Sequence, residues 1–260
     1  MKNPKLLWVL AVLITLGSAY WQRVSGPTYP LTGHTTIGGQ ELSYRLTRSH
    51  GGTTDQPVRL VAPGVVQGDL VWRRYPTSDP WTVTPMARSG DSLVGALPNQ
   101  PPAGKLEYQV RLRDGTGEVQ LPPRPAITRF KGEVSALVLA PHILAMFVSM
   151  LYSTRAGLAA LAGADSRRFV WWTCATLLVG GFVFGPAVQK QAFGEWWAGV
   201  PYGWDLTDNK TLLAGIAWAW ALFSMRGGRA ARGAIVAAAV TTLVVFAIPH
   251  STWGSEIRWQ

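Results

Sequence analysis

The apolar residues of this chain fall into five long runs separated by polar stretches. The runs cover residues 6–21, 134–152, 169–188, 211–225 and 233–250. Each run approaches the roughly 20 residues that an α-helix needs to cross the hydrocarbon core of a bilayer. The pattern therefore predicts a helical membrane protein with five transmembrane helices.

Residues 23–131 show a different pattern, in which apolar and polar residues alternate. Every second residue from Leu106 to Leu112 is apolar, and Asp114-Gly115 supplies a turn directly afterwards. A period of two indicates a half-buried strand. Similar short segments follow one another at the roughly 8 to 12 residue spacing of an all-β sandwich. We expect seven to nine strands in an immunoglobulin-like or fibronectin-like sandwich.

These two patterns divide the chain into three parts. Residues 1–22 form an N-terminal transmembrane anchor, residues 23–131 form the β-sandwich, and residues 132–260 form a four-helix transmembrane domain with a short C-terminal tail. The region between the first two spans is long enough for one soluble domain.

Basic residues set the expected orientation, because Lys and Arg in short flanking loops stay on the cytoplasmic side. Three predicted cytoplasmic segments carry eight basic residues: Lys2, Lys5, Arg155, Arg167, Arg168, Arg226, Arg229 and Arg232. They carry one acid, Asp165. We therefore expect the N-terminus to be cytoplasmic and the β domain and C-terminus to lie outside the cytoplasm, in the periplasm if the source is a bacterium with two membranes.

Charge and cysteine content narrow the classes of function. The net charge of +10 follows largely from this topology, so no nucleic-acid partner is needed to explain it. The single cysteine, Cys174, lies in the third apolar run, which excludes disulfides and paired-cysteine haem attachment within the chain.

His142 is an ionisable group inside the second apolar run, where it needs a partner. One interpretation is a neutral ring bonded to a carbonyl released by Pro141. Another is an axial ligand to a porphyrin-type metal, for which a lone histidine is a weak candidate. A third is a polar cluster with Gln189, Lys190, Glu195 and His250, all expected near the outer membrane face.

The stretch PYGWDLTDNKTLLAGIAWAWALF (201–223) joins polar residues directly to an apolar run. We expect Asp205, Thr207 and Asp208 to cap the start of the following helix, where the helix dipole favours an acid. The alternative is a cation or proton site formed by Asp205, Asp208 and Glu195. Three tryptophans suit an interfacial aromatic belt: Trp196, Trp197 and Trp204.

The same stretch offers material for contacts between helices. Trp218 and Trp220 alternate with small residues, and residues 237–239 of the last run are all alanine. Small residues let helices approach closely, and large rings fill the gaps beside them. We expect these surfaces to dock on neighbouring helices of a larger assembly.

Several motifs are spread over nearly the whole chain: QPPAGKLEYQVRL, RFKGEV, PHILAMF, STRAGL, FGPAVQKQAFGEWW, VPYGWDLTDNKTLLA and IPHSTWGSE. In these motifs the chain resembles a family of uncharacterised bacterial inner-membrane proteins. It is also similar to the small accessory S subunit of a bacterial reaction-centre light-harvesting supercomplex. The second resemblance implies a structural role beside reaction-centre or light-harvesting polypeptides, with peripheral contact to bacteriochlorophyll, carotenoid or lipid and no intrinsic cofactor.

Two classes of function follow. The β domain carries no nucleophile, base and orienting group at a recognisable spacing, so we expect a noncatalytic accessory or scaffolding subunit of a membrane complex. The second resemblance implies that this complex is a photosynthetic reaction-centre light-harvesting complex. The alternative is a small membrane transporter or enzyme with a polar site near the outer membrane face.

Overall fold

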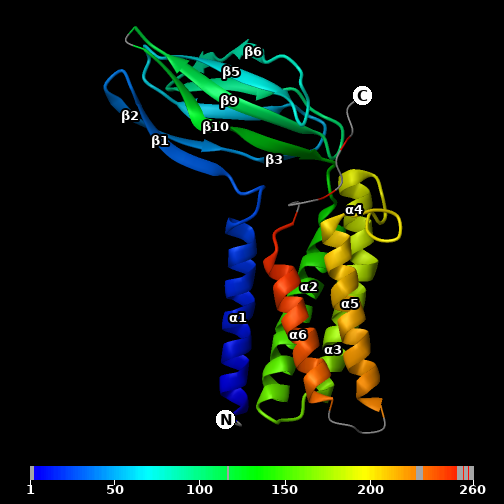
Figure 1. Cartoon of the computed structure of the whole chain (residues 1–260). Coiled ribbons are helices and arrows are strands. Elements are labelled where there is room, and N and C mark those ends of the chain that lie inside the picture. The colour runs from blue at the N-terminus through cyan, green and yellow to red at the C-terminus, as the bar shows by residue number, and fades with distance from the viewer. Residues whose placement is uncertain (1–2, 116, 227–230, 251–253, 255–256, 258–260) are drawn as a thin grey trace. The chain divides into compact units, whose positions relative to one another are not determined.

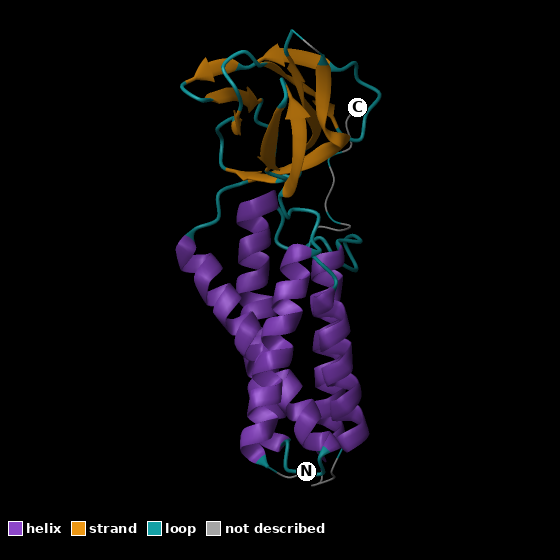
Figure 2. Cartoon of the chain, turned by 90° about the vertical axis from the view of Figure 1, so that its left-hand side faces the viewer, coloured by secondary structure: helices purple, strands orange, loops and turns teal. Residues whose placement is uncertain are grey.

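The computed structural model describes residues 3–115, 117–226, 231–250, 254 and 257 (Figures 1 and 2). The chain forms two compact units, a helical unit from Met1–Pro27 with Val134–Ser255 and a β unit that contains Thr28–Glu133. Most of the predicted C-terminal tail after His250 lies outside the described residues.

The described part of the helical unit contains five helices. The third of them is continuous over residues 167–193 and includes a π-helical segment, here called η1. The bounds are α1 Pro4–Val24, α2 Ala136–Leu161, α3 Arg167–Leu177, η1 Leu178–Phe184, α4 Gly185–Phe193, α5 Leu206–Ser224 and α6 Arg232–Ala247.

Three of these helices are long and apolar enough to cross a membrane: α1, α2 and the helix over 167–193. The expectation of a helical membrane protein is confirmed at this level, while the number of five spans stays a prediction. α6 is a shorter apolar helix of 16 residues, ending before Pro249. α5 opens with Asp208, Asn209 and Lys210, which lower its mean hydropathy.

The small residues of α5 and α6 pack inside the helical unit. Ala214, Ala221 and Ala238 are fully buried. Trp218 is 1% exposed, and its Nε1 donates a hydrogen bond to Thr242 Oγ1 at 2.8 Å. The prediction that these residues dock on another protein is wrong for Trp218 and for the buried alanines, because α5 and α6 use them to approach one another.

Two adjacent glycines let η1 pass closely between α2 and α5. A Cβ on Gly180 would lie 2.9 Å from the Cβ of Ala145, and one on Gly181 would lie 2.7 Å from Cγ2 of Thr211. Such distances are far shorter than van der Waals contact, so any side chain at these positions would force the helices apart.

The described part of the β unit has ten strands in three sheets. The hairpin β1-β2 forms one sheet, the order β3-β10-β9-β5-β6 the second, and β4-β8-β7 the third. The bounds are β1 Leu31–Ile37, β2 Gln40–Leu46, β3 Ser49–Gly51, β4 Gln56–Val61, β5 Gln67–Arg74, β6 Thr82–Pro85, β7 Ala87–Ser89, β8 Ser92–Leu97, β9 Lys105–Arg113 and β10 Glu118–Lys131.

The two larger sheets of the β unit share one apolar core. Leu70, Tyr108 and Val110 of the five-stranded sheet are fully buried, and they belong to the same cluster as Leu60 and Leu97 of the three-stranded sheet. The hydroxyl of Tyr108 donates to the carbonyl of Thr47 at 2.7 Å, so its polar end is satisfied. Burial raises the pKa of this phenol.

Two elements differ from the sequence-based expectation. Ten strands replace the expected seven to nine, because β3 and β7 are three residues long and carry no alternation. α2 continues to Leu161, so Arg155, which was assigned to a loop, lies inside this helix and is buried. The serine, alanine and glycine residues around it support this extension because they pack closely.

The first prediction concerns the contact between the two larger sheets. A Cβ on Gly95 would lie 2.7 Å from Cδ1 of Leu70, so Gly95→Ala should overpack the core and destabilise the β unit by about 1–3 kcal/mol. Guanidinium unfolding of the full-length protein in mild detergent, followed by the β-sheet circular dichroism signal, measures this. Gly64→Ala is the matched control because no heavy atom lies within 4 Å of its Cβ position. Equal unfolding midpoints for the two variants would contradict the packing described here.

Candidate functional site

The ring of His142 is hydrogen-bonded across the helix interface to η1. Its Nδ1 lies 2.9 Å from the carbonyl oxygen of Gly180. This carbonyl also accepts from the amide of Gly185, five residues later, as in a π-turn. The expected partner, a carbonyl released by Pro141, is thus replaced by one from another helix.

This hydrogen bond fixes which ring nitrogen can act as a ligand. A nitrogen that faces a carbonyl must carry the proton, so the neutral ring of His142 keeps its lone pair on Nε2. Histidines that bind metals commonly donate their other N–H to a carbonyl in this way. The geometry is compatible with the predicted axial ligand, and Nε2 is the atom that would bind the porphyrin-type metal.

His142 belongs to a polar cluster at the end of the helical unit where α5 begins and α6 ends. His250 is exposed and lies within electrostatic range of Lys210, His142 and Asp205. Lys210 is 3% exposed, and its Nζ donates to the carbonyls of Ile248 at 2.6 Å and Pro249 at 3.5 Å. We call His142, Asp205, Lys210 and His250 the polar cluster.

The other predicted members of this cluster have different positions. Gln189 is buried, and its Nε2 has no hydrogen-bond partner among the described residues. Lys190 instead donates to the carbonyl of Gly194 at 2.7 Å, beyond the end of its own helix. Glu195 is exposed.

The acids at the start of α5 hold the helix and the loop before it. Asp205 is the N-cap, and its Oδ1 accepts from the amides of Thr207 at 2.8 Å and Asp208 at 3.2 Å. Of the three residues expected to cap this helix, Asp205 is the one that does so. Asp208 instead accepts from the amide of Ala198 at 2.6 Å, which anchors the loop.

The tryptophans predicted for the membrane interface differ in exposure. Trp196 and Trp204 are 60% and 86% exposed, as a belt residue requires. Trp197 is half-buried, stacks on Phe182 with ring centres 6.1 Å apart, and donates to the carbonyl of Val200. On α5, Trp220 is 55% exposed.

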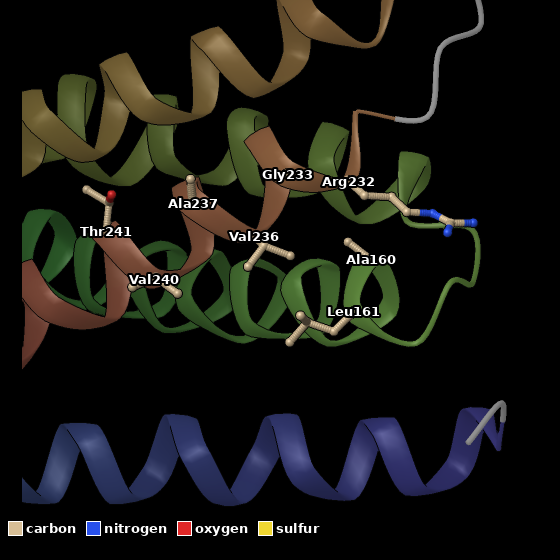
Figure 3. Close-up of a pocket in the computed structure, with 8 residues that line it drawn as sticks. All are labelled: Ala160, Leu161, Arg232, Gly233, Val236, Ala237, Val240 and Thr241. Atoms are coloured by element: carbon tan, nitrogen blue, oxygen red, sulfur yellow. The ribbon is translucent and has the colours of Figure 1, made fainter.

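An open groove of about 720 Å³ runs between α2 and α6 (Figure 3). Ala160 and Leu161 of α2 line one side, and Val236 and Val240 of α6 line the other. Arg232 stands at the end of the groove where α2 ends and α6 begins. The groove is lined mainly by apolar side chains and has one cation, Arg232, at its end.

Two buried or half-buried acids of the β unit, Asp69 and Asp79, are held in salt bridges. Asp69 accepts from Arg111 at 3.0 Å and Arg113 at 2.9 Å, and Asp79 accepts from Arg74 at 2.6 Å. The hydrogen bond from Arg74 lowers the pKa of Asp79, so the carboxylate form is favoured. These acids are held as salt-bridge partners within and beside β5 and β9.

The polar cluster offers two imidazoles, one amine and one carboxylate, the groups that relay protons in membrane proteins. In the described part of the chain, no three His, Cys, Asp or Glu side chains form a group that could hold a metal ion. Sequence reasoning missed Lys210, although a lysine placed just after an N-cap and just before an apolar run is a signal that it lies inside the helix bundle.

Comparison with family models, with curated proteins and with solved structures found no match.

The second prediction separates the roles of the two acids of α5. Asp205→Ala should destabilise the helical unit by about 1 kcal/mol, because the cap is lost. Asp208→Ala should instead release the loop over residues 196–204, because the Ala198 amide loses its acceptor. Hydrogen exchange of the loop amides in detergent measures this, and Asp208→Asn, which keeps an acceptor oxygen, is the control. Unchanged exchange in Asp208→Ala would refute this anchoring role.

Proposed function

We propose that this protein is a noncatalytic accessory subunit that stabilises a larger bacterial membrane complex, plausibly a photosynthetic reaction-centre light-harvesting complex. Its helices would contact neighbouring spans, and its β unit would contact another extracytoplasmic subunit. Reaction-centre or light-harvesting polypeptides are the proposed partners.

One observation carries this proposal: α5 presents an outward stripe with large side chains. Leu213, Ile216, Trp220 and Phe223 are 49%, 58%, 55% and 61% exposed and recur at helical spacing. Aromatic rings are enriched at protein interfaces relative to the rest of a surface. Because α5 is not among the helices apolar enough to span a membrane by composition, contact with other protein helices would support its insertion.

The strand order supports an immunoglobulin-like interpretation of the β unit. If β3 is the first strand of the sandwich, then β4, β8 and β7 correspond to strands B, E and D, and β5, β9 and β10 to C, F and G. Sandwiches of this kind commonly present loops and sheet edges to other proteins, although the fold alone implies no function.

We further propose five spans in the inner membrane, with a cytoplasmic N-terminus and a periplasmic β unit. The loops between the second and third and between the fourth and fifth spans carry the basic excess that this orientation requires. The helix that begins at Asp205 would then start at the periplasmic face.

The polar cluster favours a second candidate function, a small transporter or membrane enzyme. His250, which is exposed, lies within electrostatic range of His142, Lys210 and Asp205, and of these Lys210 and Asp205 are buried. Buried ionisable residues in membrane proteins often mark ion or proton pathways.

The third prediction distinguishes these functions. Trp220→Ala should reduce the amount of partner protein that copurifies in mild detergent, by about tenfold or more if Trp220 is an interface hot spot. Trp171→Ala is the matched control, because Trp171 is 58% exposed but lies on α3. Deleting the protein should loosen the complex without abolishing its core photochemistry. If Lys210→Met instead abolishes a solute flux or an enzymatic conversion while every complex stays intact, the transporter or enzyme function takes precedence.

The fourth prediction concerns orientation. With Cys174 replaced by Ala, a cysteine at Thr53 should react with a membrane-impermeant maleimide added to intact spheroplasts. A cysteine at Asp165 should react only after the membrane is permeabilised, because it lies in a basic loop. Labelling of position 165 from outside would reverse the proposed topology.

A further inference from the structure

Arg155 is a buried cation where three helices meet. It projects from α2 and is 3% exposed. Its guanidinium carbon lies 5.4 Å from the ring centre of Trp8 on α1 and 4.5 Å from that of Phe169 on α3. Two aromatic rings therefore flank the guanidinium group.

The described protein supplies this guanidinium with no anion. Nε and Nη1 of Arg155 are buried and have no hydrogen-bond partner among the described residues. Segments 134–194 and 209–250 contain a single acid, Asp165, whose Oδ1 accepts from the amide of Arg167. Cation–π contacts offset only part of the cost of burying a charge. Arg155 therefore keeps donors that a ligand can satisfy.

A second cation lies beside the same ring. The guanidinium carbon of Arg168 is 4.7 Å from the ring centre of Phe169, and Arg168 is exposed. The charges of Arg155 and Arg168 repel each other. An anion bound beside both groups would reduce this repulsion and accept from the unpaired Nε and Nη1 of Arg155.

The surroundings of the two arginines are apolar and aromatic. Tyr152 stacks on both Phe169 and Trp172, with ring centres 6.3 and 6.1 Å apart. Trp172 is 56% exposed, so the aromatic cluster reaches the surface of the helical unit. The three helices that meet here, α1, α2 and the helix over 167–193, are the candidate membrane spans.

We propose that Arg155 and Arg168 bind the phosphate of an anionic phospholipid whose acyl chains lie against Trp172 and Tyr152. The planar guanidinium matches phosphate geometry, and basic pockets between spans are typical headgroup sites. A phospholipid is favoured over a protein carboxylate because the same place offers two cations and an exposed aromatic surface on membrane-spanning helices.

Native mass spectrometry of the full-length protein in mild detergent tests this site. Phosphatidylglycerol should bind about tenfold more tightly than phosphatidylcholine of the same chains, as expected for charged hydrogen bonds. Arg155→Gln and Arg168→Gln should each reduce this preference. Arg226→Gln should retain it; this control removes the same charge beside a ring, since Arg226 lies 4.6 Å from the ring centre of Phe223.

Arg168 is exposed, so its variant tests the site even if Arg155→Gln fails to fold, which helical circular dichroism would reveal. Equal binding of the two lipids, or an equal loss in Arg226→Gln, overturns the proposal. If millimolar inorganic phosphate displaces phosphatidylglycerol, the site binds free phosphate and the assignment of a phospholipid ligand is wrong. If Arg155→Gln leaves lipid preference intact but loses a copurifying protein, the guanidinium pairs with a carboxylate of that partner instead.

Discussion

The close approach of η1 to α2 is the contact on which the arrangement of the helical unit depends. In a membrane every backbone group needs a partner within the protein, so a π-turn is tolerated only where its carbonyls are satisfied. The carbonyl of Gly180 receives two donors, the amide of Gly185 and the ring of His142. The absence of a side chain on Gly180 lets this second donor come from another helix.

This contact also determines what lies at the end of the bundle. The η1 segment places Phe182 against Trp197, and it places Gly181 against α5. The loop before α5 is thereby fixed from two sides, by the stacked ring and by the bond from Ala198 to Asp208. Lys210, two residues further along α5, then reaches the carbonyls at the end of α6. The polar cluster is thus a consequence of helix packing as well as a candidate site.

Repeating patterns in the sequence predicted the strands and helices. They did not predict which side chains tertiary contacts bury. The alternation in β9 and the five apolar runs placed the main elements correctly, because burial on one face imposes a period. Trp218 and Trp220 show the limit: residues two apart on a helix point in nearly opposite directions, about 200° apart. Residues 212–223 of α5 are apolar on all faces of the helix, so only contacts reveal that Trp218 lies inside and Trp220 outside.

Among the described residues of the helical unit, the two buried cations, Lys210 and Arg155, show that a basic residue in a sequence can have different structural roles. An ammonium group is compact, and Lys210 finds its acceptors at the open carbonyls where α6 ends. Arg155 lies within α2, where the neighbouring carbonyls already belong to helical hydrogen bonds. The rings of Trp8 and Phe169 flank its guanidinium group. These rings make cation–π contacts but do not accept hydrogen bonds from N–H groups in the plane of the guanidinium. The ammonium group of Lys210 is therefore hydrogen-bonded within the protein, whereas the guanidinium of Arg155 at the other end of the bundle keeps donors for an external anion. Only the position of each side chain among the helices separates a structural cation from one that can bind a ligand.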